Sequence, residues 1–100
     1  MTRADERKAA EEVEAVVSSL ARTTPRTDAL VMRLRNAANA ATRAIKNLSS
    51  ESALDAARGE AATALNGAAG LLHKQTLTQE MIDRAKSAVA TWLRELAVLD

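Results

Sequence analysis

Apolar residues recur every three or four positions through four segments of the chain, and this spacing predicts four amphipathic helices. The helices are expected over residues 3–22, 25–48, 50–72 and 78–99. Short connections between helices of similar length favour antiparallel neighbours. The predicted fold class is therefore all-α, an alanine-rich, up-down four-helix bundle that forms one domain over residues 1–100.

Polar residues at the edges of these segments mark the expected helix starts. Thr2 opens a capping-box pattern before the first helix. Thr24 is a candidate N-cap and Pro25 suits a first helical position, so the second helix is predicted to start there. The run 49–52 is expected to end that helix and cap the third, and Thr78 is the predicted N-cap of the fourth.

Each predicted helix places its larger apolar residues on one side. Trp92, the largest of them, is expected to anchor the packing with its indole N–H at the rim of the core. The predicted core residues are Ala9, Val13, Val16, Val17, Leu20, Leu30, Leu34, Ala37, Ala41, Ile45, Leu48, Leu54, Ala57, Ala61, Leu65, Ala68, Leu72, Ile82, Ala85, Val89, Trp92, Leu96 and Leu99.

Composition makes this core unusual. Alanine supplies 23 of the 47 apolar residues, and Phe and Tyr are absent. Alanine is the best helix former but buries little surface, so the helices must approach closely to pack. Because such a core is thin, the alternative is a dimer in which two helical hairpins exchange partners.

Charge and cysteine content narrow the function classes. Fourteen basic and 13 acidic residues give a net charge near +1. The lack of cysteine excludes disulfides and thiolate metal sites. No apolar run is long enough for a bilayer, and no signal peptide is recognised, so a cytoplasmic protein without a membrane partner is expected. Ten Arg against four Lys, with so much alanine, indicates a GC-rich bacterial or phage genome.

Motifs for catalysis are not found. Histidine phosphotransfer domains are four-helix bundles, but they have a lysine and a glycine just downstream of a mid-helix histidine. Here His73 and Lys74 stand at a predicted helix end, where a cation would face the helix C-terminal dipole. Without metal-ligand clusters or a glycine-rich phosphate loop, we expect no enzyme activity, no cofactor and no small-molecule substrate.

The outer side of the third predicted helix lacks the long charged residues that normally solvate a helix face. Small side chains allow another helix to approach closely. Three interpretations are open: the stripe meets a partner helix, a neighbour in the same bundle covers it, or the helix ends early near Gly59 or Gly67. This small-residue stripe consists of Ser52, Ala56, Gly59, Thr63, Asn66 and Gly70.

The second predicted helix is basic, with five Lys or Arg and one acid between residues 25 and 48. Its outer side could bind an acidic protein surface or nucleic acid, because Asn and Arg are common donors to phosphates and bases. The alternative is a solvated face paired with acids of the first and third helices. This Arg–Asn face consists of Asn36, Asn39, Arg43, Lys46 and Asn47.

Together these features predict a small non-catalytic interaction module that works by helix-on-helix docking. The expected partner is another protein or a second copy of the chain, as in a homodimer. Such a protein could serve as a chaperone, an adaptor or an inhibitor. The alternative is a nucleic-acid-binding protein that uses the basic second helix.

Overall fold

A computed structural model describes residues 1–48 and 51–99. These residues form four helices, α1 (Arg3–Ser18), α2 (Asp28–Asn47), α3 (Ser52–His73) and α4 (Gln79–Val98), and no strand. Each helix packs on the next, and α4 closes back onto α1. The all-α four-helix bundle predicted from the sequence is confirmed.

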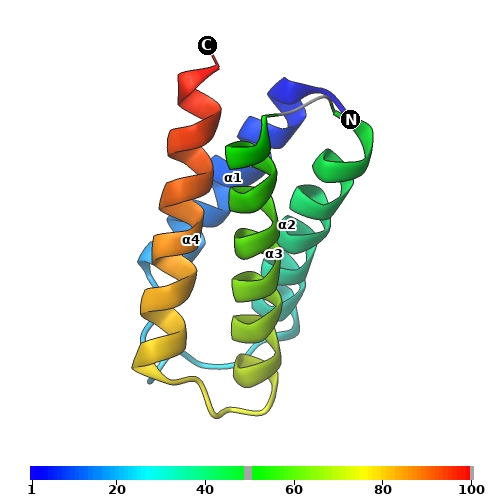
Figure 1. Cartoon of the computed structure of the whole chain (residues 1–100). Helices are drawn as coiled ribbons and strands as arrows, with labels where there is room; N and C mark the ends of the chain where they lie inside the picture. Colours follow the sequence, from blue (N-terminus) through cyan, green and yellow to red (C-terminus); the bar gives the residue numbers. More distant parts are fainter. Residues whose placement is uncertain (49–50, 100) are drawn as a thin grey trace.

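The bundle is elongated, with extents of 37 × 21 × 18 Å. Figure 1 shows α2, α3 and α4 running side by side, while α1 crosses behind them at an angle. The start of α1 and the end of α4 lie at the same end of the molecule, and the connections α1–α2 and α3–α4 lie at the other. Helices α1 and α3 occupy diagonal positions.

Hydroxyl caps fix three of the four helix starts. Thr2 forms the predicted capping box, in which its hydroxyl accepts from the Asp5 N–H at 3.1 Å and the Asp5 carboxylate accepts from the Thr2 N–H at 2.9 Å. Thr78 is confirmed as the N-cap of α4, accepting from the Met81 N–H at 3.1 Å. The predicted cap at 49–50 lies outside the described residues, and Glu51 caps α3 without a side-chain hydrogen bond.

The predicted start of α2 at Pro25 is wrong. The helix begins at Asp28, and the hydroxyl of Thr27 accepts from the Leu30 N–H at 3.1 Å. Thr24 is used elsewhere, because its hydroxyl accepts from the Ala21 N–H at 2.8 Å and closes a turn in the connection. Thr27 is the better cap because Asp28 follows it and places an acid in the first turn.

Helix α1 is shorter than predicted and ends at Ser18 instead of residue 22. The Ser19 side chain donates to the Val16 carbonyl at 2.8 Å, and the Ser19 N–H bonds the same carbonyl at 3.1 Å. This local pattern competes with helix continuation.

The core contains most of the predicted residues, including all six from α3. Ile45 is the clear error, since 39% of it is exposed. The fully buried neighbour Ala44 takes the inward position, so α2 approaches the other helices through small residues and turns Ile45 to the flank. Ala9, Leu30, Leu48 and Leu99 are half-buried.

Candidate functional site

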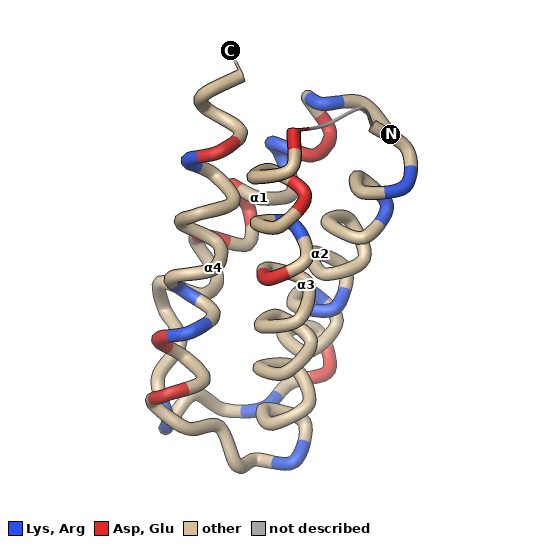
Figure 2. Tube along the Cα trace, viewed as in Figure 1, with Lys and Arg blue, Asp and Glu red and all other residues tan. Residues whose placement is uncertain are grey.

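The Arg–Asn face of α2 points away from the core. All five of its predicted residues are exposed, because Leu34 and a series of alanines occupy the buried side of the helix. Met32 lies among them and is 58% exposed. Figure 2 shows basic positions recurring along α2. The predicted residues are therefore accessible to a partner.

Four cations of α2 have no ionic partner in the described part of the chain. The sequence had left open a solvated face paired with acids of the first and third helices, and the described residues form no such pair. A local excess of unpaired positive charge attracts acidic or phosphorylated surfaces. The four residues are Arg33, Arg35, Arg43 and Lys46.

The small-residue stripe lies along the outside of α3. Four of its residues are exposed and its two glycines are half-exposed. A Cβ built at Gly59 or Gly70 would meet nothing within 4 Å. Residues 1–48 and 51–99 therefore leave this surface uncovered, and the interpretation that a neighbouring helix of the same bundle covers it is wrong.

The interpretation that α3 ends early at a glycine is also wrong, because the helix runs unbroken from Ser52 to His73. Gly67, which is not in the stripe, is the glycine that a neighbour approaches. A Cβ there would lie 3.1 Å from the Met81 sulfur of α4. Gly67 therefore marks the side of α3 that faces α4.

The stripe and the Arg–Asn face belong to α3 and α2, the two helices that pack most extensively on each other. His73 marks the side of α3 that faces the α1–α2 connection, because its Nδ1 accepts from Arg26 of that connection at 3.0 Å. Asn66 lies two turns before His73 and shares that side. After Glu60, α3 contains no Lys, Arg, Asp or Glu, and Figure 2 shows this uncharged part of the helix next to α2.

Inside the bundle lies a cluster that the sequence analysis missed. Arg58 of α3 donates to Glu6 of α1 through Nε and Nη2, both at 2.6 Å, and the indole N–H of Trp92 in α4 donates to the same carboxylate at 2.9 Å. All three side chains have 0% exposure. Trp92 is thus the predicted anchor, but its N–H lies in the core and not at the rim.

Hydrogen bonding favours the charged form of Arg58. The bonds to Glu6 are the main reason that the pKa of Arg58 is raised further above its ordinary value, even though burial acts in the opposite direction. Asp55 accepts a third bond, from Nη1 at 3.1 Å. A buried ion pair with satisfied hydrogen bonds contributes less to net stability than to fixing one arrangement of the helices.

A signal for the cluster was present in the sequence. Arg58 follows Leu54 by four positions and precedes Leu65 by seven, so it stands in the apolar stripe of α3. Glu6 precedes Val13 by seven positions and stands in the stripe of α1. Two opposite charges at core positions of different helices indicate a buried pair.

Arg26 links the α1–α2 connection to the end of α3. Arg26 pairs with Asp28 at 2.7 Å and also donates to His73, which is exposed in the last turn of α3. An open depression of about 440 Å³ lies beside this group, between the α1–α2 connection and the end of α3. His73 thus contacts a guanidinium from the α1–α2 connection in addition to standing in the last turn of its own helix.

Comparison of the chain with protein-family models, curated proteins and solved structures gives no match. Among the described residues, no group of three or more acidic or histidine side chains is arranged to hold a metal ion. None of the described helices combines the length and hydropathy that a bilayer span requires. The surface of α2 and α3 is the feature that distinguishes this bundle.

Proposed function

We propose that the protein is a small, non-catalytic interaction module of the cytoplasm that docks on another helix through its α2–α3 surface and associates with a second copy of itself. The observation that carries this proposal is the open space beside Gly59 and Gly70. A glycine inside a helix costs about 1 kcal/mol relative to alanine, and no neighbour among the described residues requires either one. Close approach of another backbone would explain both.

The small-residue stripe and the Arg–Asn face would contribute to partner recognition in different ways. The small-residue stripe offers shape, because its short side chains let a partner helix lie close to the α3 backbone. The Arg–Asn face offers charge, since cations at the edge of an interface steer acidic partners and discriminate against basic ones. Exposed Met32 adds an adaptable apolar contact on the α2 side.

Solution mass measured by size exclusion with light scattering tests this proposal. The wild-type protein should form a dimer, and Gly59→Leu or Thr63→Arg should return it to a monomer with unchanged helicity by circular dichroism. Matched controls place the same side chains on the exposed face of α4, as Ala90→Leu and Ser87→Arg, and should leave the dimer intact. Association that survives both stripe substitutions, or a wild-type monomer at high concentration, contradicts the proposal.

The unpaired cations of α2 favour nucleic acid as the second candidate. Neutralising phosphates with Lys and Arg releases counterions, so binding would weaken steeply with salt. The residues with the strongest role would be Arg43 and Lys46, which are exposed on one side of α2.

A gel-shift series at two salt concentrations distinguishes the candidates. Nucleic-acid binding predicts a complex that is lost with Arg43→Glu plus Lys46→Glu and kept with Lys86→Glu plus Arg94→Glu on α4. The second pair changes the net charge by the same amount. Equal effects of the two pairs, or no complex at low salt, would exclude this candidate.

A further inference from the structure

Helix α1 is held in the bundle less extensively than the other helices. It has 16 residues, against 20 to 22 for the others. Its packing on α2 and on α4 is smaller than the α2–α3 and α3–α4 packing. Its connection to α2, residues 19–27, is a turn without helix.

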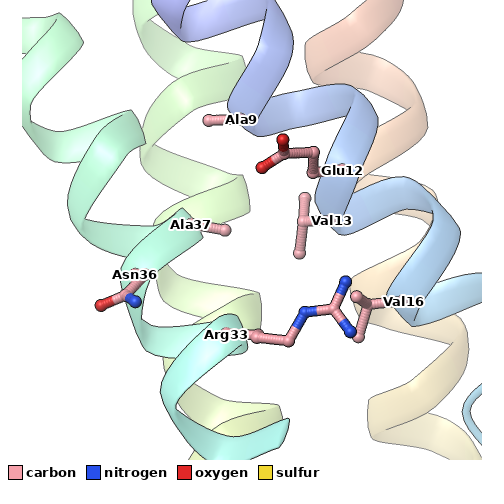
Figure 3. A pocket seen from close by; sticks show the side chains of 7 residues that line it. All are labelled: Ala9, Glu12, Val13, Val16, Arg33, Asn36 and Ala37. Atoms are coloured by element: carbon pink, nitrogen blue, oxygen red, sulfur yellow. The ribbon is translucent and has the colours of Figure 1, made fainter. Parts of the chain in front are cut away.

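The seam between α1 and α2 is not closed. A cavity of about 170 Å³ opens there, with an apolar floor that includes Val13, Val16 and Ala37. Figure 3 shows Glu12 entering it from α1 and Arg33 reaching across from α2 toward Val16. These two charges form no salt bridge with each other. The α1–α2 contact therefore contributes little selectivity for the helix that packs in the α1 position.

The polar contacts beneath α1 are selective. Arg58 and Trp92 come from α3 and α4, and both direct buried donors at the Glu6 carboxylate. A helix that replaces α1 must bring a carboxylate to the same depth, because Arg58 would otherwise keep only Asp55 as a partner and its buried Nε and Nη2 donors would have no acceptor. Helices α2, α3 and α4 thus form a groove that holds α1. We call it the acceptor groove, and a helix that binds there must carry one carboxylate that reaches Arg58 and Trp92.

We propose that this acceptor groove also binds α1 of a second copy of the chain, so that two copies exchange their first helices. Charge complementarity selects the occupant, since α1 carries Glu6 in line with the buried residues Ala10, Val13 and Val17. The exchanged dimer repeats every contact of α1 between chains and differs from the monomer only in the path of residues 19–27.

This inference goes beyond docking through α3 and does not depend on it. Exchange uses the buried side of α1, whereas the proposed docking uses the outer side of α2 and α3. Substitutions in the small-residue stripe therefore leave exchange intact. Substitutions at Glu6 or Arg58 decide whether exchange is selective.

Complementation between two full-length variants tests the exchange. Glu6→Leu leaves Arg58 without its main partner, and Arg58→Met leaves Glu6 without its ion pair. When the variants are unfolded together and refolded, exchange places the intact Glu6 beside the intact Arg58, and the two substituted positions meet each other. We expect each variant alone to melt below wild type, and the mixture to form a 1:1 dimer by native mass spectrometry with a higher melting temperature.

The controls keep the result decisive even if a single variant fails to fold. The double variant Glu6→Leu plus Arg58→Met should fold and melt at or above the temperature of wild type, which shows that the apolar pair is tolerated. The mixed dimer should also form when both chains carry Gly59→Leu, which removes the proposed association through the small-residue stripe. In that Gly59→Leu background, a mixture that melts as the sum of its parts and has the mass of single chains overturns the proposal.

Discussion

Glu6 and Arg58 meet as a two-pronged ion pair, with Nε–Oε2 and Nη2–Oε1 distances of 2.6 Å, at a point where both side chains are excluded from solvent. They come from α1 and α3, which lie diagonally across the bundle and make no direct helix–helix packing of their own. The pair therefore links two helices that alanine side chains could not bring into contact. Trp92 adds the link to α4.

Removing one member of this pair should destabilise the protein far more than removing both. We expect Glu6→Leu to cost about 3–5 kcal/mol, because it leaves a buried guanidinium that cannot lose its proton. The double variant Glu6→Leu plus Arg58→Met should be neutral or more stable than wild type by about 1–4 kcal/mol. Urea unfolding followed by circular dichroism measures both. Additive losses in the double variant would show that the charges are not coupled.

Trp92→Phe should separate the indole hydrogen bond from the ion pair. The substitution keeps an aromatic ring in the core but removes the N–H that donates to Glu6 at 2.9 Å. A lost hydrogen bond to a charged group predicts a cost of about 1.5–3 kcal/mol. The same urea experiment checks it. If the free energy of unfolding is unchanged, the carboxylate is satisfied by Arg58 alone.

The capping box at Thr2 should be sensitive to acid. The backbone N–H of Thr2 is the main cause that lowers the pKa of Asp5 from 3.8, and the Thr2 side chain adds to it. Because the pKa is lower in the folded state, this carboxylate stabilises α1 above pH 3.8, and the contribution is lost as pH falls through the lower folded value. Thr2→Ala should raise the Asp5 pKa part of the way toward 3.8, as measured by NMR titration, because it removes the hydroxyl but keeps the backbone N–H of residue 2. An unchanged titration curve would mean that the hydroxyl contact does not persist in solution.

The glycines of α3 should respond differently to alanine. Gly59→Ala and Gly70→Ala should each stabilise the folded monomer by about 0.5–1 kcal/mol, because the added Cβ enters open space. Gly67→Ala should gain less, since its Cβ would lie 3.1 Å from the sulfur of Met81. Thermal unfolding of the three variants measures how much stability each substitution gains and so checks this order.

The same alanine variants separate stability from association. If the stripe is an interface, Gly59→Ala should weaken dimer formation in dilution experiments while it raises the stability of the monomer. Gly67→Ala should leave the dissociation constant unchanged, because Gly67 faces α4. A tighter dimer with Gly59→Ala would place the contact elsewhere.

Periodicity alone was sufficient for the helix content and for the cores of α3 and α4. In α3, every predicted inward residue from Leu54 to Leu72 is buried. The start of α2 was missed because Thr24 and Thr27 are both suitable N-cap residues and Pro25 after Thr24 favoured the first. Only the hydrogen bond from Ala21 to Thr24 shows that the first is used in a turn.

The buried pair was missed for a different reason. Helical spacing places Glu6 and Arg58 on apolar faces, but charged residues there can also reach solvent past a helix edge. Whether they meet depends on the diagonal placement of α1 and α3, which the sequence does not specify. The exposed surface of α2 and α3 was predictable, because it follows from which side of each helix is apolar.

Trp92 is the only aromatic residue in the chain. Its indole is buried against a carboxylate that α1 alone supplies. Intrinsic fluorescence of the unlabelled protein therefore comes from a single chromophore that senses whether the first helix is seated. A red shift of its emission without loss of overall helicity would report departure of that helix directly.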